Sequence, residues 1–243
     1  MTTPKTDYGI DGPMVLRSLT IGGVIALTAG LAVYAMVVPA RPVAGAILSI
    51  AGFFSGFCML VQAGLMAWWS KSAKLRERER LIDALELVGN EKVLDVGCGR
   101  GLLLNGVARR LPRGMAFGID LWQTVDQSGN SPEAALVNSK AENVADRVDV
   151  ITADMRDLPF PDGSMDAVIS SIAIHNVRDR DGRAKAIREI ARVLKPNGRV
   201  ALQDFFSARE YLKTLTDLGW KDIKSSVIFV MLPPIRILTG RKP

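Results

Sequence analysis

The sequence is poor in the residues that bind metals and form disulfides. It contains one histidine and two cysteines among 243 residues, and no cluster of His, Cys and acidic residues has the spacing of a metal site. Cys58 lies in an apolar run and Cys98 in a glycine-rich turn, which makes a disulfide between them implausible and agrees with a reducing compartment. We therefore expect neither a metal site nor a disulfide.

Charged residues are absent from two long stretches near the N-terminus. Residues 18–40 and 42–70 contain no Asp, Glu, Lys or Arg. At about 1.5 Å per helical residue the first stretch covers about 35 Å, enough to cross a hydrocarbon core of about 30 Å. A cleaved signal peptide would be shorter, and a second apolar run would not follow it. The sequence predicts a membrane hairpin in residues 1–70, with spans at about 18–40 and 43–69 and a poorly ordered segment at 1–17.

Basic residues are placed unevenly around these spans. Only Arg41 lies between them, whereas a cluster of basic residues follows the second span in a linker helix predicted at 71–90: Lys71, Lys74, Arg76, Arg78 and Arg80. By the positive-inside rule, the N-terminus and the rest of the chain then lie on the cytoplasmic side of the membrane. We therefore expect a multi-pass membrane protein with its larger domain in the cytoplasm.

The second span is predicted to continue into the linker helix, because no Gly or Pro occurs between Leu65 and Val88. The apolar face of this helix is expected to carry Leu75, Ile82, Leu85 and Val88. Small residues recur at four-residue spacing in both spans, which lets helix backbones approach closely in lipid. They allow packing within the hairpin or against a second copy, so a homo-oligomer stays open.

The excess of positive charge, +6, is not carried by the larger domain. Residues 81–235 contain 20 basic and 21 acidic side chains. A nucleic-acid partner would favour a basic globular domain, so we expect none. The excess lies beside the spans and at the C-terminus, where it suits contact with anionic lipid or simple solubility.

Beyond residue 90 the chain alternates between short β-branched runs and helical stretches, a pattern typical of a parallel sheet covered by helices on both faces. We predict strands at 91–96, 115–120, 147–152, 165–170 and 198–204, and helices at 101–111, 131–143, 182–194 and 208–218. The segment 227–232 suits the last strand of the sheet.

A glycine-rich turn follows the first of these strands, with Gly97, Gly99 and Gly101 at alternate positions. Glycines permit left-handed backbone conformations and let a ligand approach the main chain. Dinucleotide-binding folds use a similar turn, but with a different glycine spacing. Asp95 before the turn would repel a pyrophosphate and attract a cationic amino-acid group, as in S-adenosylmethionine.

Acidic residues also end the next two strands. Asp120 is well placed to accept the hydroxyls of a ribose, and Asp154 with Met155 could receive an adenine, because open α/β sheets bind ligands at the carboxyl ends of their strands. The alternatives are a helix cap or surface acid at Asp120, and a turn-forming acid beside a core methionine at Asp154.

Residues 91–206 resemble the class I S-adenosylmethionine-dependent methyltransferases, particularly the ubiquinone/menaquinone-biosynthesis branch of small-molecule enzymes. The resemblance rests on Val-Leu-Asp-Val-Gly-Cys-Gly-Arg-Gly at 93–101, Gly-Ile-Asp at 118–120, and the segments at 153–160 and 189–199. It implies an α/β fold with a seven-stranded Rossmann-like sheet over 91–243, and S-adenosylmethionine as cofactor. The residues implied to bind that cofactor are Asp95, Gly97, Cys98, Gly99, Gly101, Asp120, Leu121, Asp154, Met155 and Ser171.

The residues expected to bind the methyl acceptor lie around the only histidine of the sequence. His175 follows the fourth strand and could accept a proton from the acceptor, or could only shape the pocket. The ubiquinone/menaquinone-biosynthesis methyltransferases, which this region resembles, carry Arg at the position of His175. Asn176, Asp204 and Tyr211 are candidates for the pocket wall, although aromatic residues there are as often part of the core.

These features predict a membrane-anchored methyltransferase for a small lipophilic acceptor, such as a quinone precursor, an amino lipid or a hydrophobic thiol. Anchoring raises the concentration of the enzyme around a substrate dissolved in the bilayer. The alternatives are methylation of a soluble metabolite such as a thiol, and a membrane protein that binds S-adenosylmethionine without catalysis.

Overall fold

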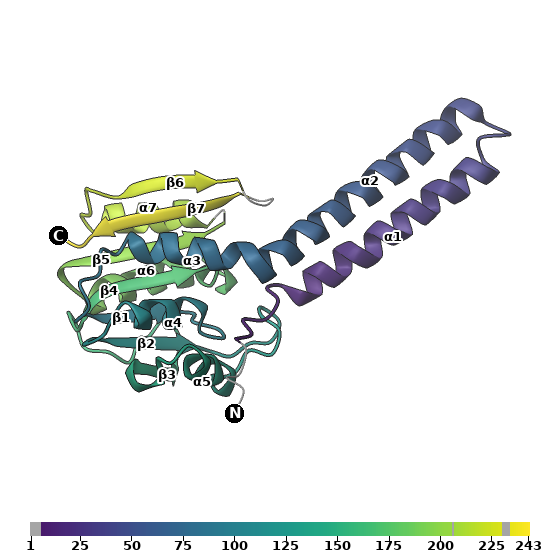
Figure 1. The fold of residues 1–243 in the computed structure, drawn as a ribbon. Coiled ribbons are helices and arrows are strands. Elements are labelled where there is room, and N and C mark those ends of the chain that lie inside the picture. Colours follow the sequence, from purple (N-terminus) through teal and green to yellow (C-terminus); the bar gives the residue numbers. More distant parts are fainter. Residues whose placement is uncertain (1–5, 206, 230–233) are drawn as a thin grey trace.

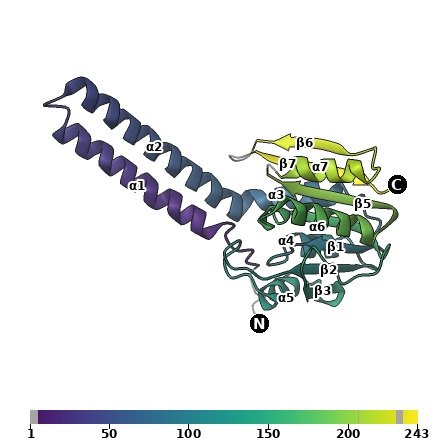
Figure 2. The same cartoon turned by 180° about the vertical axis from the view of Figure 1, so that it is seen from behind.

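The structure is a computed structural model that describes residues 6–205, 207–229 and 234–243. It consists of a long helical hairpin and a domain built on a seven-stranded sheet (Figures 1 and 2). The hairpin projects from the side of the domain toward which the parallel strands point, and the two C-terminal strands lie at one end of the sheet (Figure 1).

The hairpin comprises α1 (Pro13–Met36) and α2 (Pro42–Trp68), each with a proline in its first turn. Proline suits that position because its fixed φ fits the helix and the missing N–H has no partner there. The helices meet at glycines: a Cβ atom added to Gly52 would lie 2.9 Å from Gly30 Cα. The small residues therefore pack α1 against α2. The first helix begins five residues before the predicted start at residue 18.

The second apolar helix continues into the domain, as predicted. A π-helical turn, η1 (Trp69–Ala73), joins α2 to α3 (Lys74–Asp83). The predicted apolar face is partly wrong: Leu75 and Val88 are exposed, whereas Ile82 and Leu85 are buried. The buried stripe of α3 instead includes Lys74 and Arg78, whose charges are paired with Asp11 and Glu142, and the helix ends before Val88.

The sheet has the strand order β3-β2-β1-β4-β5-β7-β6, in which β7 runs antiparallel to both of its neighbours. Its strands are β1 (Lys92–Val96), β2 (Met115–Asp120), β3 (Val148–Thr152), β4 (Met165–Ser171), β5 (Leu194–Asp204), β6 (Lys224–Ile228) and β7 (Ile235–Arg241). The first five lie at or within a few residues of the predicted positions. This is the seven-stranded Rossmann-like sheet that the resemblance implied.

The last strand is not the predicted segment 227–232. Val227 and Ile228 end β6 at the edge of the sheet, residues 230–232 lie outside the described residues, and β7 follows at Ile235. The correction has a simple reason. In β7, Ile235 and Leu238 are fully buried against the sheet's neighbours, whereas four of the five β6 residues are exposed. Hydrophobicity alone favoured the wrong segment.

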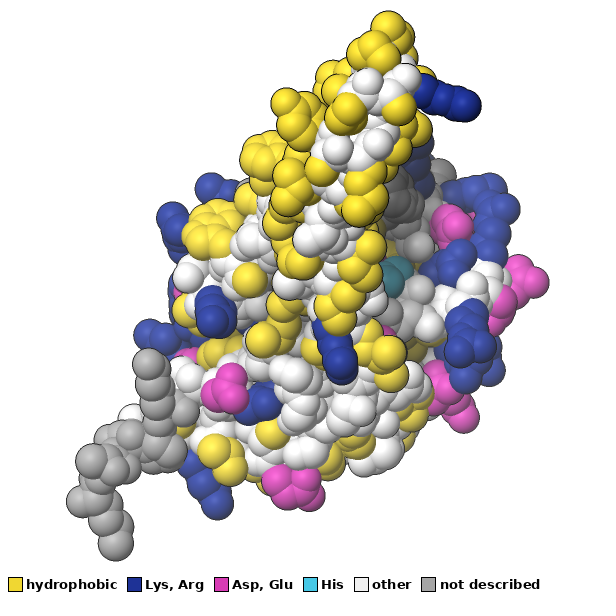
Figure 3. All heavy atoms as spheres, turned by 90° about the vertical axis from the view of Figure 1, so that its right-hand side faces the viewer, with side chains coloured by type: hydrophobic (Ala, Val, Ile, Leu, Met, Phe, Trp, Pro, Cys, Tyr) yellow, Lys and Arg dark blue, Asp and Glu magenta, His cyan; other side chains and the backbone are white. Residues whose placement is uncertain are grey.

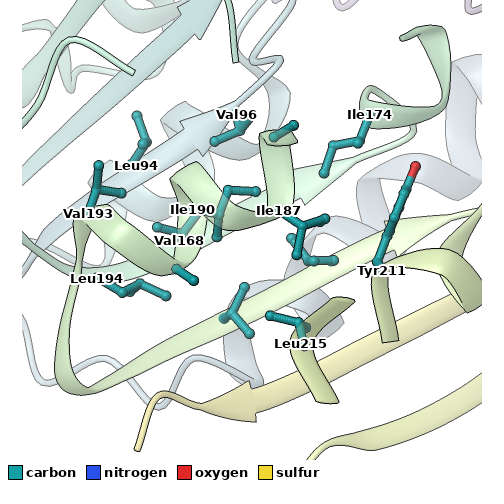
Figure 4. Close-up of a cluster of buried hydrophobic side chains, with 14 of the residues drawn as sticks. Leu94, Val96, Val168, Ile174, Ile187, Ile190, Val193, Leu194, Tyr211 and Leu215 are labelled. Carbon is teal, nitrogen blue, oxygen red and sulfur yellow. The ribbon is translucent and has the colours of Figure 1, made fainter. Parts of the chain in front are cut away.

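Helices cover both faces of the sheet: α4 (Leu102–Arg109), α5 (Pro132–Ala141), α6 (Arg180–Val193) and α7 (Ala208–Asp217), with short 3₁₀ turns η2 (Ala145–Arg147) and η3 (Ile174–Asn176). One apolar cluster lies between the sheet and α6 and α7 (Figure 4), and a second lies beneath α3 and α4. Helix α5 joins α4 through a hydrogen bond from Ser139 Oγ to Asn105 Oδ1 of 2.6 Å.

Residues 6–12, which we call the N-terminal strap, are bound to the domain, so the prediction of a poorly ordered segment is wrong for them. Lys74 Nζ donates to the carbonyl oxygens of Tyr8 and Gly9 at 2.8 and 3.1 Å and lies 3.1 Å from Asp11 Oδ1. Asp7 N–H donates to Asn138 Oδ1 at 2.9 Å. The partners lie far along the chain, and local sequence carries no signal for them.

Replacing Lys74 should loosen the strap. Lys74→Met keeps the side-chain length but leaves two carbonyls and a partly buried carboxylate without their cation, so we expect a loss of about 2–3 kcal/mol in the free energy of unfolding. The measurement is urea unfolding of the full chain in detergent micelles. Lys213→Met is the control, because its pair with Asp217 is exposed and should contribute less than about 0.5 kcal/mol. Equal losses in both variants would contradict the assignment.

Candidate active site

The predicted site residues gather at the carboxyl edge of the sheet, where the parallel strands end. Strand β1 runs into the glycine-rich turn, β2 ends at Asp120, and β5 ends at Asp204. The base of the hairpin lies at this same edge (Figure 1). Open α/β sheets bind ligands here, because successive loops diverge and leave backbone groups exposed.

Three glycines of the turn have left-handed backbone conformations, with φ of +76° at Gly97, +52° at Gly99 and +82° at Gly101. The amides of Gly97 and Cys98 donate to the carbonyl oxygen of Ile119 at 2.9 Å, and Gly101 caps α4. A Cβ atom at Gly97 would collide with the Ala173 side chain. Only glycine therefore permits this turn, as its spacing predicted.

Asp95 lies beneath the turn and is 2% exposed. Among the described residues its carboxyl oxygens accept no hydrogen bond of regular geometry, and the backbone N–H of Leu104, which lowers its pKa, does not outweigh the effect of burial. Burial, together with the negative charge of Asp120, raises the pKa of Asp95 to about 8. A buried acid without regular hydrogen bonds is costly, and a bound cation would offset that cost. The residue therefore suits the cationic group for which the sequence proposed it.

Asp120 links the glycine turn to the loop that follows β2. Its carboxylate accepts hydrogen bonds from the N–H groups of Gly99 and Trp122, at 2.9 and 2.6 Å, and from Asn130 Nδ2 at 3.1 Å. Leu121, also predicted to contact the cofactor, is 49% exposed. The structure thus brings Asp120 to the turn and leaves Leu121 facing outward.

The other cofactor candidates are divided between the turn and the surface. Met155 packs against the first apolar cluster, and its Cε lies 3.8 Å from the position of a Cβ on Gly97. Asp154 faces Arg156, with which it forms an ion pair of 2.6 Å. Ser171 Oγ donates to Gln203 Oε1 at 3.3 Å across β4 and β5. Met155 is therefore beside the turn, whereas the Asp154 carboxylate is bound to an arginine.

His175 is positioned by Asp204. Its Nδ1 lies 2.7 Å from Asp204 Oδ1, a distance that suits an ion pair, although the oxygen lies off the direction of an Nδ1–H bond. The backbone N–H of His175 donates to Asp204 Oδ2 at 3.1 Å. The imidazole is partly exposed, and Phe205 packs edge-on against it with ring centroids 5.3 Å apart. Nε2 is then the nitrogen available to a ligand.

Tyr211 completes this arrangement. Its hydroxyl donates to Asp204 Oδ2 at 2.8 Å, and burial with the nearby carboxylate raises the pKa of Tyr211 well above its usual range. It therefore stays protonated and holds Asp204 in place. The structure brings His175, Asp204 and Tyr211 together as the sequence proposed. Asn176 is exposed beside them, in η3.

Three residues of this region escaped the sequence analysis. Gln127 Oε1 accepts the N–H of Arg100 at 2.8 Å, and its Nε2 donates to the strap at Tyr8 O and Asp11. Gln203 is buried, and its Nε2 has no partner within the described parts of the chain. Burial raises the pKa of Asp126, and the charge of His175 lowers it, which places these two groups near each other. They lie outside any recognisable motif, so nothing in the sequence pointed to them.

Comparison with known proteins supports the identity of the domain. A family profile described as "Methyltransferase domain" matches residues 94–202. The chain is 37% identical over 144 residues to 27-O-demethylrifamycin SV methyltransferase of Amycolatopsis mediterranei (strain S699), covering 57% of this chain and 49% of that protein. It is 32% identical over 132 residues to the ubiquinone/menaquinone biosynthesis C-methyltransferase UbiE of Geotalea daltonii, covering 54% and 53%.

Solved structures agree on the fold. The [4+2]-cyclase SpnF superposes with a TM-score of 0.61 at 22% identity, over 72% of this chain and 83% of that one. Residues 94–202 therefore match a methyltransferase domain and share the fold of S-adenosylmethionine-dependent methyltransferases, with S-adenosylmethionine as the cofactor. The chain spans about half the length of the curated relatives it matches, and the family profile does not reach the hairpin.

The residues at the carboxyl edge fit this cofactor. S-adenosylmethionine carries a sulfonium and an ammonium group, and the buried carboxyl of Asp95 suits such charges. The left-handed glycines leave the backbone of the turn open to close approach, and Asp120 could accept the ribose hydroxyls. Asp154 could reach an adenine only by sharing its carboxylate with Arg156.

The raised pKa of Asp95 predicts that cofactor affinity depends on pH. A cation binds the ionised carboxylate, so binding releases a proton below pH 8, and affinity should rise by up to about tenfold per pH unit before levelling above pH 8. Isothermal titration of the full chain with S-adenosylmethionine from pH 6 upward measures this. Asp95→Asn should bind more weakly and without that slope. A flat profile in the unchanged protein would contradict the role of Asp95.

Proposed function

We propose that the whole chain transfers a methyl group from S-adenosylmethionine to a small lipophilic acceptor at a membrane, with His175 as the base. The observation that carries the proposal is the position of His175, held by Asp204 through both its ring and its backbone. The ubiquinone/menaquinone biosynthesis and demethylrifamycin methyltransferases among the relatives support a small-molecule acceptor.

Each side chain of this group has a chemical task. When bound, the cofactor would supply a methyl group on a positively charged sulfur, and the nucleophile of the acceptor would attack that methyl group in line. His175 Nε2 accepts the proton that the nucleophile loses and passes it to solvent through its exposed edge. Asp204 stabilises the imidazolium that forms, and the hydrogen bond from Tyr211 orients the Asp204 carboxyl group. Phe205 limits the rotation of the ring.

The hairpin supports a membrane location. Only 11% and 17% of the residues in the apolar stretches of its two helices are buried within the chain. The core helix of a soluble domain would be mostly buried. A signal sequence could explain a first apolar helix but not a second one of similar hydropathy. Figure 3 shows hydrophobic side chains, in yellow, along the visible face of the hairpin. Such a surface is stable in lipid and prone to aggregation in water.

The direction of insertion follows from the charges. Arg41 is alone in the turn between the spans, whereas exposed basic residues lie at the base of the hairpin, among them Lys71, Arg76 and Arg80. The basic end favours the cytoplasmic leaflet, with its anionic lipids. The N-terminus and the methyltransferase domain then share the cytoplasmic side.

Substitution of His175 tests the chemistry. His175→Ala should lower kcat by about 10²–10⁴-fold, because proton removal by a positioned base contributes about that much, and should leave the affinity for S-adenosylmethionine unchanged. Asp204→Asn should also lower kcat, since the imidazolium loses its counter-charge. The assay follows labelled methyl from S-adenosylmethionine into a total membrane and cytosol extract, separated into organic and aqueous phases.

The phase that receives the label decides the acceptor class. Label in the organic phase that disappears with His175→Ala supports a lipophilic acceptor. Label confined to the aqueous phase would mean that the hairpin sets location only and that a soluble metabolite is methylated. No transfer to any fraction, with intact cofactor binding, would favour a cofactor-binding protein without catalysis.

Thiol labelling tests the orientation. In a Cys58→Ser background, Ala40→Cys should react with a membrane-impermeant maleimide added outside intact cells, because it lies in the exposed turn between the spans. Ser72→Cys, exposed at the base of the hairpin, should react only after the cells are permeabilised. The opposite pattern would reverse the orientation, and equal labelling before permeabilisation would exclude a membrane-crossing hairpin.

A further inference from the structure

We propose that the acceptor is an amphiphile with a hydroxyl group that reaches His175 directly from the bilayer, at the base of the hairpin. This inference rests on the proposed function and names its substrate class and entry route. It also gives the hairpin a part in catalysis beyond location. Three features support it: the apolar contact between the hairpin and the site, the depth of that contact in the membrane, and the chemistry of a positioned base.

Contact is shown by a small apolar cluster that joins the hairpin to the site. Trp69, Ala73 and Ile235 are buried together, and the half-buried side chains of Ile172 and Phe205 pack against them. Phe205 in turn packs against the His175 ring. Phe205 therefore links the buried cluster at the base of the hairpin to the imidazole. We call Trp69, Ala73, Ile172, Phe205 and Ile235 the hairpin-base cluster.

Depth follows from the sequence of α2. The helix is uncharged up to Trp68, an exposed aromatic residue of the kind that lies at the headgroup level, and Lys71 follows three residues later. The hairpin-base cluster, which contains Trp69, then lies at the membrane surface. Phe205, which packs against this cluster and against the His175 ring, brings the imidazole close to the base of the hairpin. The reacting nitrogen is thus within reach of a molecule whose tail remains in lipid.

The backbone beside His175 is shaped for this position. Ile172 has φ of +50°, a left-handed conformation that is strained for a β-branched residue. A hydrogen bond from its N–H to Gln203 O, 2.8 Å long, holds that conformation. The turn directs the chain from β4 to η3, where His175 lies, and keeps the Ile172 side chain against the hairpin-base cluster.

Chemistry selects the hydroxyl. A neutral amine attacks a methyl sulfonium without losing a proton first, and a thiol ionises readily near neutral pH, so neither depends strongly on a base. An alcohol or phenol holds its proton at neutral pH and benefits most from a histidine oriented by a carboxylate. An acceptor that enters from the lipid keeps its apolar tail out of water. In water, each exposed methylene would lower the occupancy of the site by the acceptor roughly fourfold.

Photo-cross-linking tests the route. The full chain, with S-adenosylhomocysteine bound, is placed in phosphatidylcholine vesicles with a long-chain alkylphenol that carries a diazirine on the alkyl carbon next to the ring. We expect cross-links to the peptides that contain Ile172 and Phe205, lost when an excess of the phenol without diazirine is added. The matched probe has a methoxy group in place of the hydroxyl, and its cross-links there should fall at least fivefold.

Two variants make the result specific. Phe205→Ser should reduce the cross-link at the hairpin-base cluster, whereas Phe229→Ser, an exposed aromatic outside the cluster, should leave it unchanged. Both must bind S-adenosylmethionine normally, which shows that they are folded. Cross-links found only on the lipid-facing surfaces of α1 and α2 would overturn the proposed route, as would equal labelling by the methoxy probe.

Methyl transfer is measured separately in detergent with the organic extract. Transfer without cross-links at the cluster would leave the proposed function standing and refute the bilayer route. Absence of transfer to every fraction would refute the proposed function, and the inference with it.

Discussion

The helix that runs without a break from Pro42 to Asp83 is the constraint on which the rest of the molecule depends. Its first part is apolar and exposed, and its last part is buried against the sheet through Leu81 and Ile82. The π-helical turn Trp69–Ala73 joins these two parts without a loop, so the base of the hairpin lies at a fixed place beside the sheet. That place is the carboxyl edge of the sheet, where the candidate active site also lies (Figure 1).

Two buried carboxyls at this edge show how the environment separates chemical roles. Asp95 accepts no hydrogen bond of regular geometry within the described chain, and its pKa is raised to about 8, which suits it to a cationic ligand. Asp204 is equally buried but accepts hydrogen bonds from Tyr211, Phe205 and His175, which hold its carboxyl group in one orientation. An aspartate thus serves to bind a cation at position 95 and to orient His175 at position 204. The reason is that several donors surround the carboxyl of Asp204, whereas that of Asp95 accepts no regular hydrogen bond.

The N-terminal strap connects the hairpin with the glycine turn. Arg100, inside the turn, donates to Asp7 O at 2.8 Å, and Gln127 bonds both the strap and the backbone of Arg100. Lys74 holds the other end of the strap against the continuous helix. Hydrogen bonds thus connect the base of the hairpin to the glycine turn of the cofactor site. The hairpin-base cluster connects it to His175.

By itself, the sequence determined the elements whose pattern is local: the apolar helices, the strands with their β-branched runs, and the glycine turn, where φ above zero requires glycine. It also pointed to His175, Asp204 and Tyr211 as neighbours, because each follows a strand of one parallel sheet. Only the tertiary structure decided the strap, the charged stripe of α3, the choice of Ile235–Arg241 as the last strand, and the packing of Phe205 against the cluster that contains Trp69. Each of these joins residues far apart in the chain, and such contacts depend on packing in three dimensions, for which local periodicity carries no information.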